Sequence, residues 1–297
     1  MATSKKVQKR IGLAGSLFAL AFWAFAASAA PQQVDLKLVL AVDVSPSIND
    51  EELRVEREGT ASAFLDPNVV EAIQNGALGK IAVTMLDFSS REFNKVVIGW
   101  RIIDNSASAA AFARTVRALP RTPGRRTSIS SALELGTLLL ESSEKDITAM
   151  RRVIDVSGDG PNNNGNSMTE THDKTIAQGI VVNGLPVMDD NANGYYPDLD
   201  KYYAACVAGG RGSFVIVVHN YKDFGVAMRR KLILEISQSE TPIKRAKNDS
   251  SRARLMKVVA APQIAHPSVP QVLRPGPNEF SDNCDFAGGF FGGFQPF

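Results

Sequence analysis

The sequence is poor in histidine and lacks a serine-hydrolase motif. Only three histidines occur among its 297 residues. His172, His219 and His266 are too scattered for the short ligand spacings of a histidine metal site. Ser157 has Asp155 at the position where a Gly-x-Ser-x-Gly nucleophile elbow requires its first glycine. These absences argue against a histidine-based metal centre and against a serine hydrolase.

The chain also has no large excess of one charge and no membrane-spanning apolar run beyond its first thirty residues. Its formal net charge is +2, and the first 29 residues contribute four basic side chains and no acidic ones, so the remainder carries −2. We therefore expect no nucleic-acid partner and no integral membrane span in the mature protein. With 44% apolar and 22% charged residues, the composition is that of an ordinary globular protein.

Residues 1–29 have the pattern of a secretory signal peptide. A basic stretch from Lys5 to Arg10 precedes an apolar run from Ile11 to Ala30. The small residues Ala27-Ser28-Ala29 satisfy the cleavage rule. The alternative is an uncleaved membrane anchor, because the run is almost long enough to span a bilayer, but its alanine-rich end favours cleavage. We predict an exported protein, periplasmic or extracellular.

The two cysteines leave two alternatives open. In an oxidising compartment Cys206 and Cys284 are able to form a disulfide. The sequence does not give their separation in space, so a buried free Cys206 fits equally well.

Short β-rich runs alternate with amphipathic segments from residue 34 to residue 239. This alternation predicts a doubly wound, Rossmann-like α/β fold with a mostly parallel six-stranded sheet, one antiparallel edge strand and helices on both faces. Strands are expected at residues 36–42, 81–88, 96–100, 153–156, 180–185 and 214–218. Helices are expected at residues 51–65, 107–119, 128–140 and 223–236. Residues 240–297, proline-rich and then Gly/Phe-rich, are predicted to form a disordered tail.

The first candidate ligands follow the first expected strand. Asp43, Ser45 and Ser47 place a carboxylate and two hydroxyls at alternate positions of one turn. Hard oxygen ligands of this kind suit Mg²⁺ or Mn²⁺. The same stretch also fits the start of a helix, because Ser47 or Asn49 is able to cap the helix that follows.

Two later loops carry further oxygen ligands. Thr127 precedes the helix expected at residues 128–140 and is either a ligand or a helix cap. Asp159 follows the strand expected at residues 153–156 and is either a ligand or part of an Asp-Gly turn. In a doubly wound sheet, ligands bind at the carboxyl ends of strands where the strand order reverses. If the strands before Asp43 and Asp159 flank that crevice, the two carboxylates face one another across it.

The set Asp43-x-Ser45-x-Ser47, Thr127 and Asp159 resembles the metal-ion-dependent adhesion site of von Willebrand factor A (vWA) domains. The resemblance extends over residues 34–239 and includes the apolar strand before each element. It implies that the three hydroxyls bind a divalent cation directly and that the two aspartates act directly or through bound water. It also implies one open coordination position for an acidic residue of a protein partner, and hence a binding site without catalysis.

Longer phrases resemble a bacterial secreted family, domain of unknown function 1194. These are residues 126–130, 155–163, 180–186, 209–210 and 229–232. That family has no established activity, so this resemblance supports the fold and export more than a role. The chain departs from the family in the insert from Asp189 to Asp200 and in the Gly/Phe tail.

The insert has the spacing of a calcium-binding loop. Oxygen side chains occupy its first, third and fifth positions, a glycine its sixth and a carboxylate its twelfth. No clear helix precedes the loop, and Asp, Asn and Gly are also the usual residues of surface turns. The candidate ligands of this second, calcium site are Asp189, Asn191, Asn193, Tyr195 and Asp200.

These observations together predict an exported, non-enzymatic vWA-type protein that uses a divalent cation to bind a protein partner of unknown identity. One alternative is a Mg²⁺-dependent phosphohydrolase with Asp43 as the nucleophile. That chemistry usually has a second carboxylate where Ser45 stands. Another alternative is a structural or envelope-assembly protein that binds through its C-terminal tail.

Overall fold

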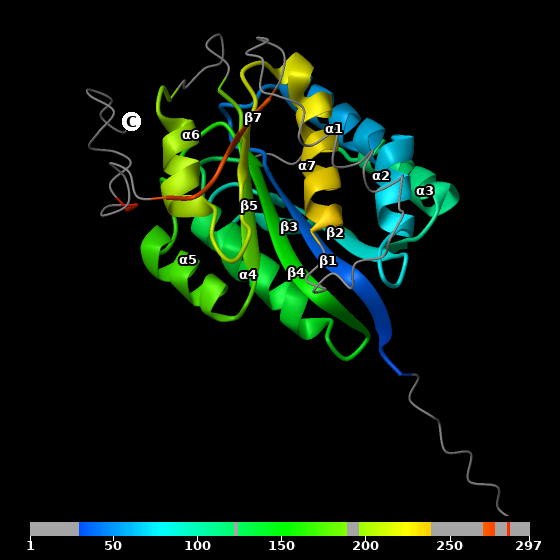
Figure 1. The fold of residues 1–297 in the computed structure, drawn as a ribbon. Coiled ribbons are helices and arrows are strands. Elements are labelled where there is room, and N and C mark those ends of the chain that lie inside the picture. Colours follow the sequence, from blue (N-terminus) through cyan, green and yellow to red (C-terminus); the bar gives the residue numbers. More distant parts are fainter. Residues whose placement is uncertain (1–29, 122–123, 189–195, 239–269, 277–283, 286–297) are drawn as a thin grey trace, which may run out of the picture. The chain divides into compact units, whose positions relative to one another are not determined.

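The computed structural model describes residues 30–121, 124–188, 196–238, 270–276 and 284–285. Within them, helices cover both faces of a seven-stranded sheet with the order β3-β2-β1-β4-β5-β6-β7 (Figure 1). The strands are β1 Gln32–Asp43, β2 Ile81–Phe88, β3 Asn94–Ile103, β4 Ile147–Gly158, β5 Val181–Pro186, β6 Val215–Val217 and β7 Gln271–Leu273. The helices are α1 Asp50–Leu65, α2 Pro67–Gln74, α3 Ser106–Arg117, α4 Ile129–Ser142, α5 Met168–Ala177, α6 Leu199–Tyr202, a π-helical turn at Tyr203–Val207, a 3₁₀ turn at Tyr221–Asp223 and α7 Phe224–Ser237.

The strand order confirms the predicted doubly wound sheet. β1 pairs in parallel with β2 on one side and with β4 on the other, so the chain order reverses at β1. β3 pairs antiparallel with β2 and forms one edge, as predicted. The carboxyl ends of β1 and β4 therefore flank the crevice at which doubly wound folds bind ligands.

The predicted strand number was wrong. A seventh strand, β7, pairs antiparallel with β6, so both edges of the sheet are antiparallel. It comes from the stretch that was predicted to be a disordered tail, and its three residues are too few to give a periodic pattern. Helices α2 and α5 were also missed, since only longer amphipathic segments were expected to be helical.

Alternating side chains of β1 divide the core into two layers. Leu36, Leu38 and Leu40 pack with α1, α3 and α7, whereas Val39 and Ala41 pack with α4 and the helical turns before β6. Figure 1 shows these two helix groups on opposite faces of the sheet. Because successive strand residues point to opposite faces, a strand that is buried on both sides must be apolar throughout.

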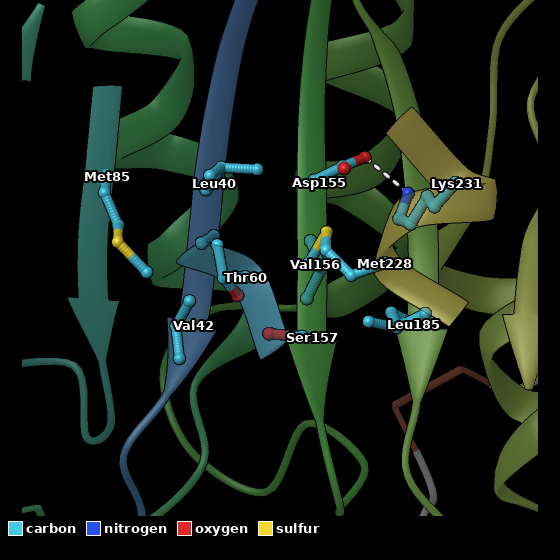
Figure 2. Close-up of a pocket in the computed structure, with 11 residues that line it drawn as sticks. Leu40, Val42, Thr60, Met85, Asp155, Val156, Ser157, Leu185, Met228 and Lys231 are labelled. Carbon is cyan, nitrogen blue, oxygen red and sulfur yellow. Dashed lines mark hydrogen bonds and ion pairs between the residues drawn. The ribbon is translucent and has the colours of Figure 1, made fainter. Parts of the chain in front are cut away.

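The layer beneath α1 and α7 also contains buried charges. Lys231 of α7 is fully buried and its Nζ binds Asp155 of β4 and, at 2.8 Å, Glu235 Oε1. Figure 2 shows the Asp155–Lys231 pair beside a small cavity of about 10 Å³, which Thr60 and Ser157 also line. This volume is near the lower limit for one water molecule.

Cys206 and Cys284 form a disulfide, with Cα atoms 5.4 Å apart. Of the two alternatives that the sequence left open, pairing is therefore the one observed. The next residue, Asp285, accepts a hydrogen bond from Ser167 Oγ at 2.7 Å and another from the Met168 amide at the start of α5. These contacts join the end of the described chain to the α5 side of the sheet.

The predicted signal peptide, residues 1–29, lies outside the described residues. Within the described ranges no helix is both long enough and apolar enough to cross a membrane.

Candidate metal centre

Three loops at the carboxyl ends of β1 and β4 bring the five predicted ligands to one edge of the sheet. Asp43 is the last residue of β1, and Asp159 comes directly after β4. The parallel pairing of the two strands continues to Val42 and Ser157, which fixes the spacing of both carboxylates. Thr127 stands two residues before α4, in the loop between α3 and α4.

The loop from β1 to α1 is folded back upon Asp43. The Ser45 amide donates to Asp43 Oδ1 at 2.8 Å, and the hydroxyls of Ser45 and Ser47 lie 2.9 Å apart. Asn49 caps α1 by accepting hydrogen bonds from two backbone amides, and Glu52 closes a capping box with it. Asn49 is thus the cap, which leaves the Ser47 hydroxyl for the site.

Ser47 joins the loop after β1 to the loop after β4. Its hydroxyl donates to Asp159 Oδ1 at 2.7 Å. The Asp43 side chain is completely buried, and Asp159 is 5% exposed. Each aspartate retains a buried Oδ2 atom that has no hydrogen-bond partner among the described residues. Two orphaned carboxylate oxygens beside three hydroxyls are the atoms that a hard divalent cation needs.

Thr127 is held in place by its backbone. Its amide donates to Asn163 Oδ1, and its carbonyl accepts from the Asn163 amide, both at 2.9 Å. Ser128 caps α4, so the Thr127 side chain is not used as the cap. A Cβ atom built on Gly160 would lie 3.7 Å from Thr127 Oγ1, which places this hydroxyl next to the residue that follows Asp159.

The centre contains a surplus of buried negative charge. Burial, and then the charge of Asp159, raises the pKa of Asp43 well above its ordinary range. Burial also raises the pKa of Asp159 to about 6. Carboxylates whose pKa values are raised in this way are those that a nearby cation would stabilise.

Glu56 is a third buried carboxylate that the sequence analysis missed. It accepts a hydrogen bond from Ser157 Oγ at 2.6 Å, and burial raises its pKa to about 7. Its position three residues after Leu53 and eight before Phe64 places it on the apolar face of α1. An acidic residue on the apolar face of a helix was the feature of the sequence that could have revealed Glu56.

Tyr203 is a second missed neighbour. A Cβ atom built on Gly158 would lie 3.0 Å from both Asp43 Oδ2 and the Tyr203 hydroxyl, so a side chain at position 158 would require these two groups to move. The hydroxyl is buried and has no hydrogen-bond partner in the described part of the chain. Burial, and then the charge of Asp43, raises the Tyr203 pKa, so this phenol stays neutral beside the aspartates. No helix or strand was predicted at residue 203, which is why Tyr203 was missed.

Most of the predicted calcium loop lies outside the described residues, including Asp189, Asn191, Asn193 and Tyr195. Asp200 is in the first turn of α6. The calcium site stays a prediction.

No group of three His, Cys, Asp or Glu side chains that could hold a metal ion occurs within the described ranges. The candidate centre has a different composition, with two carboxylates and three hydroxyls. Such a set fits a hard ion that keeps part of its water, as Mg²⁺ does.

The chain is similar in sequence to a protein family and in fold to several solved structures. The model of the family described as "Protein of unknown function (DUF1194)" matches residues 33–240. No curated protein matches the chain in sequence.

Solved structures give similarities that concern the fold alone. Proximal thread matrix protein 1 from the mussel byssus, with a zinc-occupied MIDAS motif, is 16% identical with a TM-score of 0.49, over 70% of this chain and 50% of that one. A von Willebrand factor type A structure from Catenulispora acidiphila is 12% identical with a TM-score of 0.47, over 69% and 43%. The pilus adhesin SpaC from Lactobacillus rhamnosus GG is 15% identical with a TM-score of 0.46, over 70% and 31%. This chain thus spans half or less of each of these three chains. Its sheet has the doubly wound, mostly parallel arrangement that was predicted from the sequence.

Proposed function

The chain belongs to the DUF1194 family of proteins of unknown function, and from this premise we propose that it is an exported binding protein. Its site at the carboxyl ends of β1 and β4 holds a divalent cation, Mg²⁺ or Mn²⁺. The protein uses that cation to bind an acidic side chain of a protein partner. The site has no catalytic role in this proposal.

The observation that carries the proposal is the pair of orphaned oxygens, Asp43 Oδ2 and Asp159 Oδ2. A buried charge without a partner is strongly destabilising, and proteins keep such groups mainly where a ligand or metal compensates them. The raised pKa values of both aspartates express the same unfavourable charge. A cation between them would remove it.

Each residue has a defined part in such a centre. Ser45, Ser47 and Thr127 supply hydroxyl oxygens, and the two aspartates supply the negative charge. The Ser45 amide holds the loop after β1 in position, and the Asn163 side chain holds the loop before α4. When bound, the cation supplies an electrophilic position at which a partner's carboxylate completes the coordination. Only two anionic side chains would face the ion directly, which leaves it attractive to a third.

Export is supported by two independent features. The sequence of residues 1–29 has the pattern of a signal peptide. The Cys206–Cys284 disulfide is a bond that persists in oxidising compartments and is rare in the cytosol of most organisms. The periplasm and the cell exterior both meet this requirement.

Calorimetric titration of the mature chain with Mg²⁺, Mn²⁺ and Ca²⁺ tests the metal centre. Asp43→Asn and Asp159→Asn keep the side-chain shape and remove the charge, and we expect each to weaken binding by more than about a hundredfold. Asp173→Asn, an exposed aspartate on α5, is the matched control and should bind as the parent does. Circular dichroism establishes that each variant is folded.

Saturable binding that survives in both variants would contradict the proposed centre and direct attention to the Asp189–Asp200 loop. The phosphohydrolase alternative has its own test, a turnover screen with phosphate esters, in which the proposal expects no activity. Deletion of the chain after Asp285 separates the tail-binding alternative, because it would abolish partner capture only in that case.

A further inference from the structure

A second cleft, of about 720 Å³, lies at the amino ends of β4, β5 and β6, at the opposite edge of the sheet from the metal centre. Its volume falls within the range of ordinary small-molecule sites, about 300–1,000 Å³. The charged side chains that line it are Glu144, Arg151, Arg152, Arg211 and Arg274. Lys37, which is completely buried, already balances Glu144 through an ion pair of 2.8 Å. The charges of Arg152, Arg211 and Arg274 have no acidic partner among the described residues.

Arg152 is held at the end of α5. Its Nη2 atom donates to the carbonyl oxygen of Gln178, the residue that caps the C-terminus of that helix. A carbonyl at a helix C-terminus carries only a partial negative charge, so it orients the guanidinium group without neutralising it. The group has five N–H donors in all. Within the described part of the chain this contact uses one of them, which leaves the others for a ligand.

Arg274, the residue after β7, is fixed between a turn and an aromatic ring. Its Nη1 atom donates to the carbonyl oxygens of Gly212 and Ser213 at 3.0 and 3.3 Å. Its Cζ atom lies 5.8 Å from the centroid of the Phe214 ring, which is the distance of a cation–π contact. All three partners are uncharged, so they orient the guanidinium group and leave its charge in place. A side chain that is already ordered loses little entropy when a ligand binds.

Arg211 lies in the turn before β6. The glycines on either side, Gly210 and Gly212, have φ angles of +88° and +81°, a conformation that other residues rarely adopt. The Gly212 carbonyl accepts hydrogen bonds from Gln238 Nε2 at 3.3 Å and from Arg274, which ties the turn to the end of α7 and to β7. Arg211 itself is exposed, and its side chain has no hydrogen bond or ion pair with any described residue. The fold thus presents this guanidinium group on a fixed backbone.

Met150 gives the cleft an apolar part. Its side chain lines the cleft and is 53% exposed. Met150 and Arg152 are two residues apart on β4, so their side chains point to the same face of the sheet. An exposed apolar side chain beside guanidinium groups favours a ligand that has a carbon skeleton as well as anionic groups.

We propose that this cleft binds a small organic polyanion, a molecule that carries two or more carboxylate or phosphate groups on a carbon skeleton. Arg152, Arg211 and Arg274 bind the anionic groups, and the skeleton lies against Met150. Carboxylates and phosphates both offer the pair of oxygen atoms that a guanidinium fork binds with two parallel hydrogen bonds. Because three separate segments supply the arginines, a ligand with several anionic groups is preferred over one with a single group. This site does not require the cation of the metal centre.

The charge of the cleft argues against the chain's own next segment as its occupant. Residues 239–269 follow Gln238, which lines the cleft, and they contain six Lys and Arg against two Glu and Asp. A basic segment does not complement a site lined by arginines. The other candidate within the chain is the stretch from residue 277 to 283, with Glu279 and Asp282, which the experiment below separates.

Calorimetric titration of the full mature chain tests this proposal. Metal ions are first removed with a chelating resin, because EDTA in solution is itself a polycarboxylate and would compete for the cleft. The carboxylate probes are tricarballylate, which has several carboxylates, and acetate, which has one. The phosphate probes are a hexose bisphosphate and the matching hexose monophosphate.

We expect at least one of the two polyanions to bind saturably, with an affinity at least about tenfold higher than that of its singly substituted counterpart, since each added charged hydrogen bond contributes about that factor. Binding of tricarballylate alone would support the proposal with carboxylates as the groups recognised. Binding of the bisphosphate alone would support it with phosphates.

The variants Arg152→Ala, Arg211→Ala and Arg274→Ala should each weaken binding of the polyanion by about tenfold, as expected for loss of a hydrogen bond between charged groups. Arg211→Ala has the greatest weight, because this side chain has no described structural contact whose loss could alter the fold. Arg114→Ala on α3 removes an exposed arginine from another surface and should change affinity by less than about twofold.

Several outcomes would overturn the proposal. These are no saturable binding of either polyanion, equal affinity for a polyanion and its singly substituted counterpart, and unchanged affinity in Arg211→Ala. Binding that appears only after Mg²⁺ is added would move the ligand to the metal centre. Binding that appears only in the Glu279→Gln/Asp282→Asn double variant would show that the chain itself occupies the cleft.

Discussion

The two ends of β4 differ in charge, in burial and in the elements that surround them. At the carboxyl end, Asp159 meets Asp43 in a buried anionic centre built from loops that follow parallel strands. At the amino end, Arg151 and Arg152 border an open cationic cleft that exists because β5 starts later than β1 does along β4. The comparison teaches that the two ends of one strand can have opposite charge, since strand ends are positioned by different neighbours.

The largest effect on stability is expected at the buried charge cluster that lies between the two ends of β4. Lys231→Met would leave Asp155 and Glu235 buried without their cation, and we expect a loss of about 3–5 kcal/mol in the free energy of unfolding. Urea denaturation measures it. Lys174→Met, which removes an exposed pair with Glu170, is the control and should cost less than about 1 kcal/mol. Equal losses in the two variants would contradict the assignment of Lys231 as the buried cation of this cluster.

The next effect is a pH dependence that arises at the carboxyl end. Burial raises the pKa of Glu56 from its ordinary value of 4.5 to about 7, so the folded chain holds this proton more tightly than the unfolded chain does. The stabilisation is complete below about pH 4.5 and is lost as the pH rises through about 7, with an upper limit of about 3 kcal/mol. Asp159 acts with the same sign.

Urea denaturation in EDTA at about pH 5 and pH 8 measures this change. Glu56→Gln should remove much of the pH dependence, and saturating Mg²⁺ should reduce it because the cation compensates the charges. Arg211→Ala, at the other end of β4, should leave the pH dependence unchanged. Stability that rises with pH over this window would overturn the assignment.

The smallest effect is expected at the amino end. Arg211→Ala should change the free energy of unfolding by less than about 0.5 kcal/mol, because the side chain is exposed and has no described partner. Arg152→Ala should cost about 1 kcal/mol, since its guanidinium binds the carbonyl that ends α5. Thermal unfolding gives both values. A large loss in Arg211→Ala would mean that this arginine is structural, and the contrast between the ends would weaken.

The carboxyl end could be predicted from the sequence because its residues are close to strand ends. Asp43 and Asp159 each follow an apolar run, and parallel strands bring their carboxyl ends to one edge. Glu56 was overlooked although its helical spacing was visible. The role of Asn49 required the structure, since Ser47 was an equally good cap in sequence.

The amino end could not be predicted. Arg152, Arg211 and Arg274 are far apart in the sequence, and each is an ordinary basic residue of its own segment. They meet only because β5 and β6 begin later than β4 and because β7 returns beside β6. That return, and the pairing of Cys206 with Cys284, depend on long-range contacts that local periodicity does not encode.

The disulfide also changes what a break in the backbone means for this molecule. Cys206 and Cys284 close the chain between them into a covalent ring. A protease that cuts anywhere within that ring produces two polypeptides that remain one molecule until the bond is reduced. If the cut comes before β7, the C-terminal piece, which contains β7 and Arg274, would stay attached through the disulfide, so cleavage and release would be separate events.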